Sequence, residues 1–249
     1  MRGAPQGTAT RRPPRRRLRR PAPGARRPAP GDRRRCPSRP CGARGCPGRR
    51  CGRIAGVPNL SIAQDAAADE LLGRDPLALL LGMLLDQQFP MERAFGSPRL
   101  LADRLGVQSL SAEDLAAMDA EDLVRVFQGP PALHRYPGSM AARTQELCRL
   151  LVERYDGRAE NLWADVPDGA TLLKRLGELP GFGAQKSKIF VALLGKQYGA
   201  TPPGWREAAG DYGADGARRS VADITGPESL AEVRAFKQEQ KQAAKAAKA

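Results

Sequence analysis

The chain is short of several features that define whole classes of protein. It has no apolar run of about 20 residues, the length that a membrane-spanning helix needs, and its start lacks the apolar core of a secretory signal. It holds one histidine, His134, so no second imidazole can share a metal ion with it. No stretch shows the alternating pattern of a strand. We therefore predict an all-α protein of the cytoplasm with no membrane segment, and His134 as a loop residue rather than a ligand or base.

Acidic residues are almost absent from the first 56 residues. This segment holds 18 arginines and one aspartate, a net charge of +17, and subtracting that from +14 for the whole chain leaves −3. Bulky apolar residues are also scarce there, so burial cannot offset the entropy of ordering the segment. We predict a disordered basic arm over 1–56, a helical domain over 57–226 and a C-terminal helix with a basic tail over 227–249. The net charge of +14 suggests a nucleic-acid partner, but any such affinity of the mildly acidic body must come from a local patch.

Four of the five cysteines lie in the arm at a regular five-residue interval: Cys36, Cys41, Cys46 and Cys51. Four thiolates can bind zinc or an iron–sulfur cluster. Their spacing is not that of paired Cys-x-x-Cys knuckles, and the intervening Pro and Arg continue the composition of the arm. We therefore favour low-complexity sequence and predict no cofactor, with metal binding by the arm as the alternative. A reducing cytoplasm also predicts no disulfides.

The most informative stretch is 172–194, where two apolar helical patterns flank a Leu-Pro-Gly-Phe-Gly turn. Pro180 ends the first helix because proline has no amide hydrogen. Gly181 and Gly183 permit a tight turn whose backbone can approach a ligand closely. The first amides of the second helix have no acceptor within the helix and lie at its positive end, so the turn is suited to bind a phosphate.

Two lysines add positive charge near this turn, and nothing in the turn reads a base edge. Such a contact positions a protein on nucleic acid without specifying sequence. An ordinary helical hairpin is the alternative, but the whole pattern of apolar helix, turn and second apolar helix favours phosphate binding. The predicted DNA-contacting residues of the hairpin (171–197) are Gly181, Phe182, Gly183, Gln185, Lys186 and Lys188.

This hairpin resembles that of the helix-hairpin-helix-Gly/Pro-Asp superfamily of base-excision DNA glycosylases. The similarity runs from about Leu77 to about Trp205, roughly half the chain. It implies a monomeric, glycosylase-like helical fold that binds damaged or mispaired double-stranded DNA and flips a base out of the duplex. It also implies that the apolar helix over 77–88 ends by bringing a polar side chain to the opened duplex. Gln88, with Gln87 beside it, stands at that position, and a solvated helix end is the alternative.

The resemblance also implies a carboxylate that supports the cationic sugar or activates water and, in some members, an amine nucleophile that opens the second hairpin helix. Gln185 stands where the amine is expected. Lys186 follows one residue later, rotated by about 100° around the helix, so no lyase step is expected. Pro203 stands where the catalytic Asp is expected. Three carboxylates are candidates to replace it: Asp223, which a role as helix cap would also explain, and Glu207 and Asp211, which solvated loops would also explain.

The sequence therefore predicts a base-excision repair protein associated with the nucleoid, acting as a monofunctional DNA glycosylase. The alternative is a non-catalytic DNA-binding protein of the same fold that recognises distorted or damaged duplex.

Overall fold

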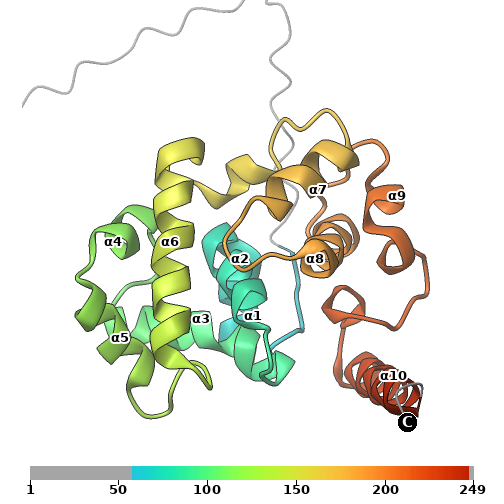
Figure 1. The fold of residues 1–249 in the computed structure, drawn as a ribbon, viewed down its shortest axis with the longest axis horizontal. Coiled ribbons are helices and arrows are strands. Elements are labelled where there is room, and N and C mark those ends of the chain that lie inside the picture. Colours follow the sequence, from blue (N-terminus) through green and yellow to red (C-terminus); the bar gives the residue numbers. More distant parts are fainter. Residues whose placement is uncertain (1–57, 247–249) are drawn as a thin grey trace, which may run out of the picture. The chain divides into compact units, whose positions relative to one another are not determined.

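Helices are the only regular elements in residues 58–246, the part of the chain that the computed structural model describes. The prediction of an all-α fold is confirmed for this range (Figure 1). The basic arm, with Cys36, Cys41, Cys46 and Cys51, lies outside the described residues, as do the last residues of the tail. No helix in the described range is long and apolar enough to cross a membrane.

The centre of the fold is α2 (Pro76–Leu85), which is buried from Leu77 to Leu85. Asp75 starts this helix: one carboxylate oxygen accepts from the amides of Leu77 and Ala78, both at 3.0 Å. The other oxygen accepts from Leu110 N at 2.7 Å and so ties the helix to a distant loop. A helix that is apolar on all sides is stable only when other helices surround it. The flanking helices α1 (Ala66–Arg74) and α3 (Met91–Leu105) pack directly on it.

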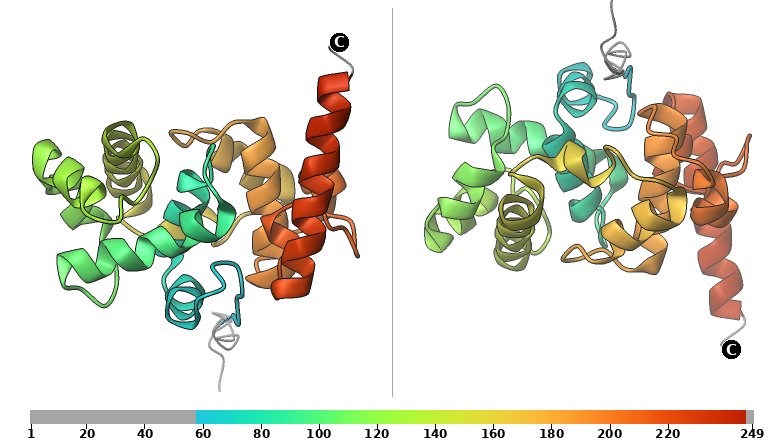
Figure 2. Two further views of the ribbon diagram at one scale, coloured as in Figure 1. Left: turned by 90° about the horizontal axis from the view of Figure 1, so that it is seen from below. Right: turned by 90° about the horizontal axis from the view of Figure 1, so that it is seen from above.

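A first group of helices packs around α6 (Pro137–Tyr155), with α4 (Ala112–Ala117) and α5 (Ala120–Gln128) beside it. Both short helices begin at a side-chain cap, as the acidic starts in the sequence suggest. Ser111 Oγ accepts from Asp114 N at 3.0 Å, and Asp119 accepts from Glu121 N at 2.9 Å. Figure 2 shows this group on one side of α2 and the hairpin helices on the other.

The second group consists of α7 (Gly169–Gly177), α8 (Ala184–Gln197), α9 (Trp205–Ala209) and α10 (Pro227–Ala246). The single turn η1 (Ala159–Leu162) precedes α7, and η2 (Gly210–Tyr212) and η3 (Val221–Asp223) lie between α9 and α10. Trp205 closes the core here, because its ring fills the space where a side chain at Gly195 would lie. Leu230 and Val233 are buried near the start of α10. The rest of that helix runs outward from the body (Figure 2).

Candidate nucleic-acid interface

The predicted hairpin is present, with α7 and α8 joined by a turn over 178–183. Leu179 and Phe182 are buried, and the Phe182 ring lies 5.9 Å from that of Phe190, edge to face. Gly181 between them is exposed and has φ 79°, a left-handed conformation that favours glycine. The Phe182 side chain therefore anchors the turn in the core, while the backbone of Gly181 and Gly183 lies exposed at this corner.

The backbone amides of this corner are the donors that the phosphate hypothesis requires. Gly183 is the N-cap of α8 and makes no side-chain cap. The first amide of α8 with a helical partner is Ser187 N, which donates to Gly183 O at 3.0 Å. No acceptor within residues 58–246 receives the amides of the four exposed residues at this corner: Gly181, Gly183, Ala184 and Gln185. Unpaired amides at the positive end of a helix attract an anion.

The two glycines of the turn have different surroundings. A Cβ at Gly181 would lie 2.7 Å from Leu84 Cδ1 and 3.4 Å from Gln87 Nε2, so a side chain there would push the hairpin away from α2. A Cβ at Gly183 would meet nothing within 4 Å. Gly181 thus allows the hairpin to pack closely on α2, whereas Gly183, which has no side chain, leaves the neighbouring amides of the turn uncovered.

The turn that follows α2 lies beside this corner. Gln87 Nε2 donates to Leu84 O at 2.8 Å and, at 3.5 Å, to Gly181 O of the hairpin. Gln87 Oε1 accepts from Arg143 Nη1 at 3.0 Å. The Gln87 side chain therefore holds the two segments together. Gln88 is exposed, has φ 52° and makes no side-chain hydrogen bond to any described residue, so of the predicted pair it is Gln88 that is free to meet a ligand.

His134 supports the turn after α2 through a hydrogen bond to Gln87 O. It lies in a loop, as predicted, but is buried. Its Nδ1 accepts from Tyr136 N at 3.0 Å, so Nε2 carries the hydrogen that Gln87 O accepts at 3.0 Å. Burial lowers the pKa of this imidazole and favours the neutral form that these two bonds require. His134 is a structural support of the interface, which the sequence pattern could not show.

The two lysines in the first half of α8, Lys186 and Lys188, have different surroundings. Lys188 is exposed. Lys186 Nζ donates to Leu84 O at 2.9 Å and lies 5.6 Å from the centre of the Phe182 ring. Burial lowers the pKa of Lys186 to about 8, although Asp86 nearby acts in the opposite direction. Lys186 therefore ties the hairpin to α2, and its contact with DNA stays a prediction.

A cleft of about 650 Å³ opens beside the first turn of α8, and we call it the Gln185 cleft. In its lining, Gln185 Nε2 donates to Tyr212 Oη at 2.9 Å. The Arg219 guanidinium, also in the lining, pairs with Asp211 at 2.9 Å. Its remaining lining includes Lys188, Ile189, Phe236, Lys237 and Lys241. An amide, a phenol, a carboxylate and cations around apolar side chains form a suitable environment for a nucleotide.

The three candidate carboxylates have very different surroundings. Asp223 is 1% exposed in its side chain, pairs with Lys196 at 2.6 Å and accepts from Ser220 N at 3.0 Å, within the capping box of η3. This is the helix-cap role that the sequence left open. Glu207 is exposed on α9 and lines none of the larger clefts among the described residues. Asp211 alone of the three lies in the Gln185 cleft.

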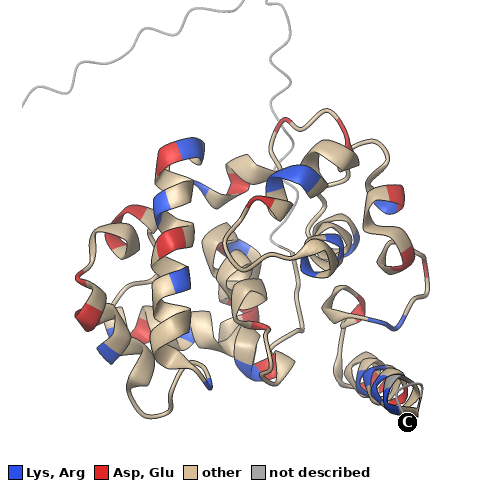
Figure 3. Ribbon diagram, in the orientation of Figure 1, with Lys and Arg blue, Asp and Glu red and all other residues tan. Residues whose placement is uncertain are grey.

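Charge is distributed unevenly over the described residues. Figure 3 shows lysine and arginine on α8 and, together with some acidic residues, on α10, whereas acidic residues mark α4 and the start of α5. The cations of α10 at the clefts are Arg234, Lys237 and Lys241. A local basic surface therefore lies beside the hairpin, although the body as a whole is mildly acidic.

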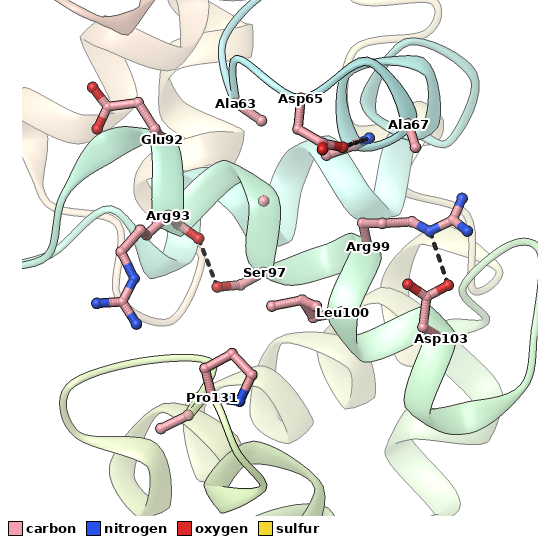
Figure 4. Close-up of a pocket in the computed structure, with 13 residues that line it drawn as sticks. Ala63, Asp65, Ala67, Glu92, Arg93, Ser97, Arg99, Leu100, Asp103 and Pro131 are labelled. Carbon is pink, nitrogen blue, oxygen red and sulfur yellow. Dashed lines mark hydrogen bonds and ion pairs between the residues drawn. The ribbon is translucent and has the colours of Figure 1, made fainter.

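A different cleft, of about 470 Å³, lies between α1 and α3 (Figure 4). Two of its polar contacts are already formed: Ser97 Oγ donates to Arg93 O at 2.7 Å, and Arg99 Nε pairs with Asp103 at 2.9 Å. It includes no residue of the hairpin or of the turn after α2. We therefore place the candidate interface at the hairpin rather than in this cleft.

No group of three or more metal-ligating side chains occurs in the described range. Comparisons with protein-family models, curated proteins and solved structures find no match to this chain. The resemblance to the glycosylase superfamily therefore depends on the residues of the hairpin and the segments that lead to it.

Proposed function

We propose that this protein is a base-excision repair protein that binds double-stranded DNA through the hairpin. The observation that carries the proposal is the exposed corner with the unpaired amides of Gly181, Gly183, Ala184 and Gln185. One phosphate of a DNA strand would accept from these amides, with Lys188 close by in sequence to add attraction. Because such contacts involve only the backbone of the DNA, they suit a protein that examines many sequences.

The second element of the proposal is the exposed Gln88, held next to the hairpin by the Gln87 bridge. A left-handed φ is uncommon for a residue other than glycine and persists where the surroundings hold it in place. When the phosphate lies on the hairpin, the Gln88 amide is well placed to enter the gap left by an extruded base. An amide both donates and accepts, so it can replace the hydrogen bonds of the missing partner.

The proposed chemistry is hydrolysis of one N-glycosidic bond in the Gln185 cleft. Asp211 is the candidate carboxylate, because of the three it alone lines this cleft. It would take a proton from water as the water oxygen bonds to C1′ of the sugar, and the bonding electrons would leave with the base, which then accepts a proton. No lyase step is proposed, since Gln185 offers no amine and Lys186 Nζ is bonded to Leu84 O.

The second candidate is a non-catalytic protein that recognises distorted or damaged duplex. It is favoured by the state of the carboxylates: Asp211 is 81% exposed and paired with Arg219, and Asp223 has both oxygens engaged. Neither has the buried, unpaired surroundings that commonly tune a catalytic carboxyl.

A base-release assay over a panel of damaged and mispaired duplexes separates the two candidates. Under the glycosylase hypothesis, Asp211→Asn abolishes base release while Glu207→Gln, a matched loss of one exposed charge, retains it. Asp223→Asn is interpreted only together with a thermal melt, because this residue supports η3. Tight binding of a lesion duplex by the wild-type protein with no base released establishes the second candidate. Failure to bind any duplex contradicts both.

A further inference from the structure

A second cleft, of about 900 Å³, lies between the turn after α2 and α10, and we call it the Asp86 cleft. Its residues of interest are Asp86, Gln88, Phe89, Arg234, Lys237 and Lys241. Lys237 and Lys241 also line the Gln185 cleft, so the two clefts adjoin along α10. The Asp86 cleft therefore belongs to the same basic surface and contains the residue proposed to enter the DNA.

The carboxylate of Asp86 has no partner among the described residues. Asp86 is the C-cap of α2, and its backbone amide donates to Gly82 O at 3.1 Å. Its side chain is half-buried, yet no described residue donates a hydrogen bond to it or forms an ion pair with it. A partly desolvated carboxylate without donors is unfavourable. Burial raises the pKa of Asp86, and the charges of Lys237 and Lys186 reduce that rise. The Asp86 carboxylate is thus a hydrogen-bond acceptor that lines the cleft and has no donor among the described residues.

The rest of the cleft supplies complementary chemistry. Lys241 is exposed on α10, and Arg234 nearby is paired with Glu92 at 2.5 Å. Phe89 lines the cleft with a partly buried ring, whose centre lies 4.8 Å from that of the His134 ring and 4.8 Å from the Arg93 guanidinium that packs over it. Cations attract a phosphate, the uncovered part of an aromatic ring packs against a base, and a carboxylate accepts from N–H groups. A nucleotide carries all three partners: a phosphate, a flat base and N–H groups on that base.

We propose that the Asp86 cleft binds one unpaired nucleotide of DNA and that Asp86 selects bases with an N–H donor edge. The inference rests on the proposed DNA-binding function and adds a determinant of base preference. Guanine offers two adjacent donors, N1–H and the amino group, to the two carboxylate oxygens. Adenine and cytosine offer one amino group, and thymine offers a single N–H between two carbonyl oxygens. The expected order of affinity therefore begins with guanine and ends with thymine.

The test is fluorescence anisotropy with labelled duplexes that carry a single bulged guanine or a single bulged thymine. The variants are Asp86→Asn, which keeps the size of the side chain, and Glu239→Gln, which removes an exposed charge from α10 outside both clefts. Wild-type protein is expected to prefer the guanine bulge at least tenfold. Asp86→Asn is expected to bind the guanine bulge more weakly and the thymine bulge more tightly, because it loses an acceptor and also a negative charge.

Opposite changes for the two bulges support the proposal, because a merely structural or long-range electrostatic role would move both affinities in the same direction. Glu239→Gln is expected to strengthen both slightly. Equal tightening of both bulges by Asp86→Asn, or no guanine preference in the wild-type protein, overturns the inference and leaves DNA binding by the hairpin intact. A wild-type protein that binds neither bulged nor fully paired duplex overturns the proposed function itself. Thermal melts confirm that each variant is folded.

Discussion

The hairpin hypothesis makes its sharpest prediction at Gly183. This residue caps α8 with φ −84° and ψ 172°, an extended conformation that any residue adopts. A side chain there meets no atom within 4 Å. Aspartate is a favourable N-cap residue, so Gly183→Asp is expected to keep the fold and to stabilise α8 by a few tenths of a kcal/mol. The same carboxylate would lie where the phosphate of DNA is proposed to bind.

The size of the effect follows from the charges. Two unit charges about 4 Å apart repel by about 1 kcal/mol in bulk water and by about 4 kcal/mol at an effective dielectric constant of 20. The corner is exposed on one side and bounded by protein on the other, so the repulsion lies between these limits. We therefore expect Gly183→Asp to weaken duplex binding by roughly 5-fold to 1,000-fold, with the smaller effect at high salt, where screening is strongest.

Gly183→Asn is the matched control, because it has the same shape and capping ability without the charge. Anisotropy titrations with an undamaged duplex, at two salt concentrations, compare the three proteins, and thermal melts confirm their folding. The expected result is that Gly183→Asn binds far more tightly than Gly183→Asp, although both melt at or above the wild-type temperature. Equal affinities for the aspartate and asparagine variants at low salt would refute the phosphate site. Gly181→Asp is a poorer probe, since a side chain there collides with Leu84 and disturbs packing as well as charge.

Three further predictions concern buried and half-buried charges. Lys196→Met leaves the Asp223 carboxylate buried without its partner. The variant is expected to lower the free energy of unfolding by roughly 3–5 kcal/mol in denaturant titrations. A loss below about 1 kcal/mol would contradict the role of Lys196 in neutralising Asp223. The raised pKa of Asp86 means that the folded state holds this proton more tightly, so its contribution to stability falls as pH rises above 3.8. Asp86→Asn should therefore melt higher than wild type at pH 7, with the gain disappearing below pH 3.8, and equal melting temperatures at pH 7 would count against the vacant carboxylate. The pKa of Lys186 is lowered from 10.5 to about 8, so the folded protein gives up this proton more readily than the unfolded chain. The free energy of unfolding of the wild-type protein should therefore rise between pH 8 and 10.5 relative to that of Lys186→Met. Parallel pH profiles for the two proteins would show that the amine is solvated.

The hairpin could be predicted from sequence because its determinants are local. Proline ends one helix, glycine permits the left-handed turn, and apolar residues at helical spacing bury both flanking helices. The all-α class follows from the same periodicity. The sequence also indicated that Lys186 faces away from the direction of Gln185, since one residue along a helix is a rotation of about 100°. It could not show that Leu84 O receives the Lys186 amine, because that acceptor is 102 residues away.

The arrangement of the candidate site could not be predicted from sequence, because it depends on contacts between residues far apart in the chain. Gln87 and Gln88 are adjacent and alike in sequence, yet only the contacts of Gln87 with Gly181 and Arg143 leave Gln88 as the exposed member of the pair. Asp223 and Asp211 were both candidates on sequence, and only the ion pair with Lys196 accounted for Asp223. Nothing near Asp86 in sequence marks it as unpaired, because the cleft that exposes it is completed by α10, at the other end of the domain.

The sequence by itself therefore determined the class of fold, the turn with its free amides and the position of the basic residues along the chain. These features follow from backbone conformation and from the spacing of a few neighbouring residues. Only the tertiary structure decided which polar side chains are engaged and which are open to a ligand. That distinction depends on burial and on partners from distant helices, which determine whether a charge is neutralised in the core or faces a cleft.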